Sequence, residues 1–120
     1  MEESNDLLSL IDKHKDQPGI DVYKLKPETV IEVVTQNSTY ELKVSHTPGY
    51  VYAKGGKHIK IKTLVHFNGC TFGGSAIRSG WIGRGMHMEI MLSKKRMLTT
   101  TKVKAATIHG DGWKYELWEN

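Results

Sequence analysis

The sequence contains little cysteine and no long apolar run, and each absence excludes a class of protein. Cys70 is the single cysteine, so the monomer forms no internal disulfide and no zinc site with several cysteine ligands. No run approaches the roughly 18 apolar residues that a membrane-crossing helix needs. The N-terminus is acidic where a signal peptide would be basic and then apolar. The sequence therefore predicts a cytoplasmic protein that makes no contact with a membrane.

Motifs that fix a reaction are also absent. The chain has no Gly-x-x-x-x-Gly-Lys-Ser/Thr phosphate loop, no dinucleotide-binding fingerprint, and no Gly-x-Ser-x-Gly elbow around Ser75. Cys70 with His66 or His87 would give a thiol nucleophile and its base, but no Asp or Asn is evidently placed to orient either imidazole. We therefore predict no catalytic residue. A small enzyme, in which a pocket brings Cys70 or Ser75 next to a histidine, is a further alternative to the binding functions considered below.

Six histidines make metal binding a hypothesis to consider. His58 and His66 share a predicted strand face, but eight residues of strand separate them by roughly 26 Å, which is too far for one ion. We predict no metal and no cofactor.

The residues that are present suffice for one folded domain. A single core typically serves roughly 100–150 residues, so a chain of 120 residues has no room for a second one. The formal net charge of +4 conceals a split, because residues 1–21 carry six acids and two bases, whereas the rest carries fifteen bases and seven acids. An acidic arm on a basic body indicates an anionic partner for the body. Solubility alone explains the same charge equally well.

The start of the chain differs in pattern from the rest. Leucines and Ile11 recur at helical spacing after Ser4, a residue type that caps helices. A Pro-Gly pair ends the pattern. We predict a helix over about residues 4–16 within an acidic arm of residues 1–18, followed by a β domain of residues 19–120.

From residue 20 onward the hydrophobic period becomes two, which is typical of half-buried strands. The segments with strand-like patterns are 29–35, 39–44, 50–54, 57–67, 86–92, 97–109 and 113–118. Turn residues separate them. Such a series of short strands predicts an all-β fold. We expect a single small β-barrel of SH3-like or OB-like size, because closure removes exposed edges, and a small sandwich is the alternative.

The segment 57–67 shows the clearest difference between two strand faces. The apolar set is Ile59, Ile61, Val65 and Phe67. The polar set is His58, Lys60, Lys62 and His66. We expect the apolar set in the core and the polar set on the surface as a basic stripe, because successive strand residues point to opposite faces.

Residues 69–85 contain six of the twelve glycines, the highest density in the chain. The candidate ligand-binding residues of this loop are Gly73, Gly74, Ser75, Arg78, Trp81 and Arg84. Successive backbone N–H groups bind anions, and an indole between two arginines suits stacking on a base. Alternatively the loop is a structural connection held by apolar anchors. The anchors would be Phe72, Ile77, Trp81 and Ile82.

These patterns favour a binding module over an enzyme, with nucleic acid or another anionic macromolecule as partner. Outside the loop, the candidate contact residues are Lys60, Lys62, Lys94, Lys95 and Arg96. The alternative is a protein–protein interaction or self-association domain, in which the glycine-rich loop and the Met and Trp residues form the interface. Salt separates the two, because phosphate contacts weaken steeply as salt rises, whereas apolar interfaces weaken much less.

Overall fold

The computed structural model describes residues 11–12, 19–73 and 76–118, and they form strands almost throughout. In chain order the elements are β1 (Ile11–Asp12), β2 (Gly19–Asp21), the 3-10 helix η1 (Val22–Lys24), β3 (Val30–Thr35), β4 (Thr39–Val44), β5 (Tyr50–Gly55), β6 (Ile59–Thr71), β7 (Arg78–Ser79), β8 (Trp81–Gly83), β9 (His87–Ser93), β10 (Arg96–Gly110) and β11 (Trp113–Glu116). Within these described ranges no helix is long and apolar enough to cross a membrane. The predicted all-β fold is confirmed.

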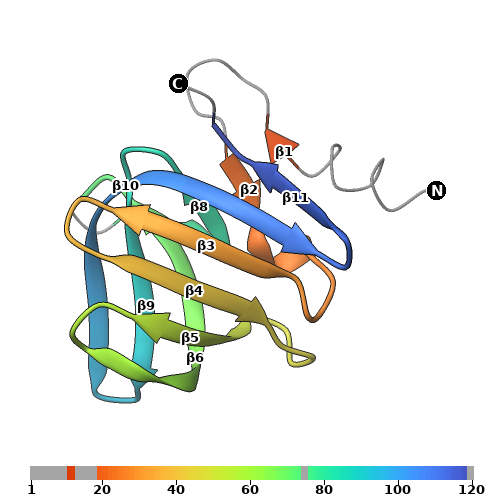
Figure 1. Ribbon diagram of the computed structural model, residues 1–120. Coiled ribbons are helices and arrows are strands. Elements are labelled where there is room, and N and C mark those ends of the chain that lie inside the picture. The colour runs from red at the N-terminus through yellow and green to blue at the C-terminus, as the bar shows by residue number, and fades with distance from the viewer. Residues whose placement is uncertain (1–10, 13–18, 74–75, 119–120) are drawn as a thin grey trace.

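Six strands pair in a closed ring (Figure 1). β3, β4, β5 and β6 are antiparallel neighbours in chain order, and β6 also pairs with β9. β10 closes the ring, because its first half pairs with β9, whereas its second half, from Val103, pairs with β3. Beyond the ring, β11 pairs with β10 and β7 pairs with β6, while β1, β2 and β8 form a separate three-stranded sheet.

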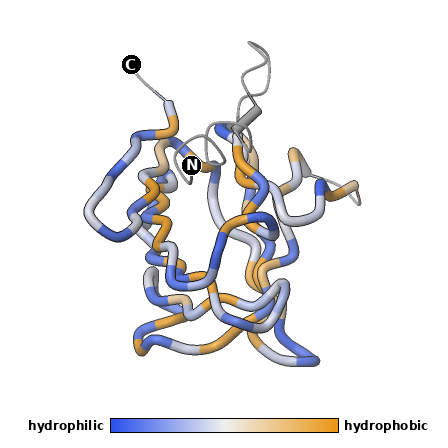
Figure 2. The backbone as a smooth tube through the Cα atoms, turned by 90° about the vertical axis from the view of Figure 1, so that its right-hand side faces the viewer, coloured by the Kyte–Doolittle hydropathy of each residue, from blue (hydrophilic) through white to orange (hydrophobic). Residues whose placement is uncertain are grey.

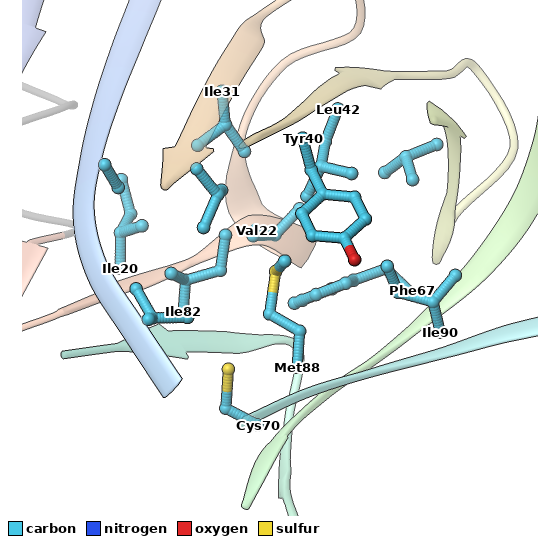
Figure 3. Close-up of a cluster of buried hydrophobic side chains, with 14 of the residues drawn as sticks. Ile20, Val22, Ile31, Tyr40, Leu42, Phe67, Cys70, Ile82, Met88 and Ile90 are labelled. Carbon is cyan, nitrogen blue, oxygen red and sulfur yellow. The ribbon is translucent and has the colours of Figure 1, made fainter. Parts of the chain in front are cut away.

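The core forms because side chains alternate between the two faces of the ring. Tyr40, Leu42 and Val44 of β4 are buried, as the alternating pattern predicts. Phe67 of β6 and Met88 of β9 belong to the same buried cluster (Figure 3). Figure 2 shows the alternation as short hydrophobic and hydrophilic segments that follow one another along the backbone.

The predicted N-terminal helix is not seen. Residues Ile11–Asp12 form β1 and pair antiparallel with Gly19 and Ile20 of β2. The other residues of the predicted helix, 4–10 and 13–16, lie outside the described residues. Helical spacing is a local signal, and tertiary contacts can override it. The spacing of the leucines therefore does not reveal that Ile11 and Asp12 pair with β2.

One residue of the apolar set in β6 faces the opposite way from its prediction. Ile61 is 78% exposed, although the alternation places it in the core. Gly55 pairs with Ile59, but Ala53 pairs with Thr63, so two residue steps of β5 oppose four steps of β6. The extra residues form a bulge, which breaks the alternation and turns Ile61 to solvent. The other members of the apolar set, Ile59, Val65 and Phe67, are buried, as predicted.

Candidate nucleic-acid interface

A row of side chains crosses four strands on the outer face of the ring. Tyr50 of β5 is the Cα partner of His66 in β6, His66 is the partner of Met91 in β9, and Met91 is the partner of Met97 in β10. Phe67, next to His66, points into the core, so the row faces outward. Tyr50, Met91 and Met97 are 39%, 37% and 46% exposed, which makes the row an open apolar surface.

Tyr52 and Leu64 extend this surface by a second row. They are Cα partners and are 40% and 46% exposed. Side chains two residues apart on one strand face are about 7 Å apart, so Tyr50 and Tyr52 are neighbouring rings on β5. We call Tyr50, Tyr52, Leu64 and His66 the tyrosine face.

Contacts with neighbouring groups orient His66 in this face. Its Nδ1 lies 2.5 Å from Oδ1 of Asn68, which is hydrogen-bonding distance. The ring of Tyr50 meets the imidazole edge-on at a centroid distance of 5.1 Å, and Tyr23 flanks it at 6.3 Å. The Tyr23 hydroxyl donates to the carbonyl oxygen of Phe67 at 2.7 Å. The imidazole and the two flanking rings are therefore held in defined orientations.

Basic side chains gather at one end of the sheet, beside the tyrosine face. Neighbouring strands here are antiparallel, so the ends of β5 and β9 lie at the same edge of the sheet as the starts of β6 and β10. The start of β6 and the turn between β9 and β10 lie there (Figure 1). The exposed cations at this end, which we call the basic end, are Lys60, Lys62, Lys94, Lys95 and Arg96. The structure thus brings to one end five cations that the sequence predicted as contact residues.

Acidic side chains are scarce around the basic end. The sequence contains no Asp or Glu between Glu41 and Glu89. Glu41 is the Cα partner of Lys54, and an ion pair of 2.9 Å joins Glu28 to Lys43 of β4, so acids accompany the lysines on that side of the sheet. Glu89 lies on β9 beyond the row, away from the basic end. The segment of chain that carries Lys60 and Lys62 therefore supplies no carboxylate of its own to offset them.

Trp81 is an anchor, as the structural alternative predicts. It is 5% exposed, so a base cannot stack on it. The ring lies against Gly19 and Gly83, where an added Cβ would approach Trp81 ring atoms to 2.6 Å and 2.9 Å. The Arg78 guanidinium carbon lies 3.5 Å from the ring centroid and makes a cation–π contact. Glycines and an arginine thus enclose the indole.

The other predicted anchors divide into two groups. Ile82 is fully buried, as predicted. Phe72 is 60% exposed and Ile77 is 38% exposed, so their anchor prediction is wrong. Both lie beyond the end of β6, where the chain has left the paired part of the sheet, and an irregular segment does not bury every apolar side chain.

The glycine-rich loop lies away from the basic end. Arg78 is the Cα partner of Cys70 near the end of β6, whereas Lys60 and Lys62 lie near its beginning. Gly73 and Arg84 are exposed, and Gly74 and Ser75 lie outside the described residues. The structure therefore does not bring the loop together with the other predicted contact residues.

Cys70 and His66 do not form a nucleophile–base pair. Asn68 does orient His66, a partner that sequence reasoning missed. Cys70, however, is fully buried in the core cluster (Figure 3). His66 belongs to the outer face, where it pairs with Tyr50. Burial raises the pKa of the Cys70 thiol to about 12, so the thiol is neutral near pH 7. Within the described ranges, no three His, Cys, Asp or Glu side chains group as metal ligands.

Tyr50 and Tyr52 are the surface residues that sequence reasoning missed. The signal was present in residues 50–53, where Tyr alternates with Val and Ala. Val51 and Ala53 are buried, so the larger aromatic residues take the outer face. Large exposed aromatics on one strand face are more informative than scattered apolar residues, because contiguous exposed patches mark binding surfaces.

Comparison of the chain with models of protein families, with curated proteins and with solved structures finds no match.

Proposed function

We propose that the protein is a binding module for nucleic acid, and that the basic end makes the phosphate contacts. The observation that carries the proposal is the gathering of Lys60, Lys62, Lys94, Lys95 and Arg96 at one end of the sheet. No acid occurs in the sequence from residue 42 to residue 88 to offset the lysines of β6. A surface of one sign attracts a polyanion and raises its association rate.

In this proposal the ring of strands is a small closed β-barrel, and its role is to hold the contacts in place. Strands fix the positions of Lys60 and Lys62, while the turn between β9 and β10 supplies three cations in succession. Each lysine or arginine that meets a phosphate releases counterions, so binding should weaken as salt rises. Contacts from Arg78 and Arg84 are not needed, because their loop lies elsewhere.

Fluorescence anisotropy with a labelled single strand of about 15 nucleotides tests the proposal. The basic-end variant is Lys60→Gln/Lys62→Gln/Lys95→Gln. The matched control removes the same charge from exposed lysines elsewhere and is Lys102→Gln/Lys104→Gln/Lys114→Gln. We expect about tenfold or greater loss of affinity for the basic-end variant, less than about threefold loss for the control, and steep weakening between about 50 mM and 200 mM salt.

Two results would overturn the proposal. One is no binding by the unaltered protein at low salt. The other is an equal loss for the basic-end variant and its control, which would mean that net charge alone drives association. If the protein instead self-associates through a salt-insensitive contact and ignores nucleic acid, the interaction-domain alternative replaces the proposal.

A further inference from the structure

We infer that the tyrosine face stacks on the bases of single-stranded nucleic acid. This inference rests on the proposed function and deepens it: the basic end holds phosphates, and Tyr50 and Tyr52 each receive a base. Stacking on aromatic side chains tolerates any base, because every base has a π face. The tyrosine face therefore gives affinity for single strands without requiring a particular sequence.

The spacing of the two tyrosines favours single strands over duplexes. Tyr50 and Tyr52 lie two residues apart on the same face of β5, which separates them by about 7 Å. Bases in a duplex strand rise by about 3.4 Å. Successive bases can reach both rings only when they are unstacked from one another. Unstacking requires less free energy in a single strand than in a duplex, because no base pairs have to break.

Exposure and order together make the face fit for stacking. Tyr50 is 39% exposed and Tyr52 is 40% exposed, so part of each ring is open. His66 contacts Tyr50 edge-on and is itself oriented by Asn68. Rings that are already ordered lose less conformational entropy when a ligand binds.

The distribution of charge indicates the direction in which the bound nucleic acid runs across the tyrosine face. The basic end lies ahead of Tyr52 along β5, in the direction away from Tyr50. On the opposite side of the row, Glu89 presents a negative charge that repels phosphates. The single-stranded nucleic acid should therefore run from the basic end over Tyr52 and then over Tyr50.

The test compares aromatic and aliphatic replacements in the full chain. Tyr50→Leu/Tyr52→Leu keeps apolar bulk but removes the rings, Tyr50→Phe/Tyr52→Phe keeps the rings, and Phe72→Leu removes an exposed ring at the far end of β6. The probes are a single strand of about 15 nucleotides, as DNA and as RNA, and a DNA duplex of equal length. We expect about tenfold weaker single-strand binding for the Leu pair, near-normal binding for the Phe pair and Phe72→Leu, and unchanged duplex binding.

The outcomes separate this inference from the proposed function. If the Leu pair binds single strands normally while the basic-end variant is weak, stacking is wrong and the phosphate contacts stand. If the unaltered protein binds nothing, both fall. A direct readout needs no variant: stacking on tyrosine moves the base-proton resonances of the bound strand upfield by ring currents. Base protons that do not shift in a saturated complex would overturn stacking even if the Leu pair unfolds.

Discussion

At the scale of single residues, the structure separates groups that stabilise the fold from groups available to a ligand. Trp81 and Cys70 attract attention in the sequence, and both are buried. Trp81 fills the space that Gly19 and Gly83 leave open, because neither glycine has a side chain to collide with the indole. Aromatic exposure is found instead at positions such as Tyr52.

The environment of Cys70 leads to a pH-dependent prediction. Burial raises the pKa of its thiol from an ordinary value of 9.0 to about 12. At a pH between these two pKa values, the thiol is deprotonated in the unfolded chain but protonated in the folded chain. The free energy of unfolding should therefore fall as pH rises through this range. Urea denaturation at several pH values between 8 and 10.5 measures this effect. We expect the free energy of unfolding to fall more steeply with pH in the unaltered protein than in Cys70→Ala, by up to about 1.4 kcal/mol per pH unit.

A labelling experiment at pH 8 gives the control for this prediction. The thiol of the native protein should react with a disulfide reagent only as fast as the protein opens, because only the thiolate is nucleophilic and it is shielded. Rapid stoichiometric labelling of the native protein, or parallel pH profiles for the two proteins, would show that Cys70 is accessible.

At this scale the sequence is informative about packing and less informative about surfaces. Alternation in β4 correctly places Tyr40 and Leu42 inside. In β5 the alternation of tyrosine with Val51 and Ala53 is consistent with tyrosines on the surface, but a tyrosine is compatible with either face of a strand. Which residues of β6 lie beside the tyrosines depends on strand pairing, which is a contact between segments distant in sequence.

At the scale of elements, β6 connects the features of the molecule. Its first part pairs with β5, its later part pairs with β9 and β7, and a bulge lies near its start. The bulge explains why a regular pattern in the sequence does not give a regular strand. It also leaves Lys60, Ile61 and Lys62 all exposed at the basic end.

The bulge is tested by a matched pair of substitutions in β6. Ile59 is 3% exposed and Ile61 is 78% exposed, although strict alternation places both in the core. We expect Ile59→Ala to lower the free energy of unfolding by about 2–5 kcal/mol and Ile61→Ala to change it by less than about 0.5 kcal/mol. Urea denaturation measures both, and similar losses would mean that Ile61 is buried and the register shift is absent.

Element types were easier to predict than their pairing. Period-two patterns predicted strands at 29–35 and 39–44, and these are β3 and β4, which pair with Val33 and Tyr40 as partners. Ile11 illustrates the opposite case, because its helical spacing is real but the residue pairs in β1. Closure of the ring by β10 depends on two partners at once, which no local pattern encodes.

At the scale of the whole molecule, we assign different roles to the two ends of β6. The glycine-rich loop at its far end holds Trp81 in the fold, and the basic end and the tyrosine face form the proposed contact surface. The sequence predicted the glycine-rich loop and the cations of the basic end as parts of one contact site. Only the course of β6 through the sheet shows that they are apart.

A map of backbone amide chemical shifts, recorded as a single-stranded oligonucleotide is added, locates the surface that contacts nucleic acid. We expect the largest changes in residues 50–54, 60–66 and 91–97, with little change in residues 78–84 and 113–116. Changes concentrated in residues 78–84, or spread evenly over all strands, would show that the basic end and the tyrosine face are not the contact surface.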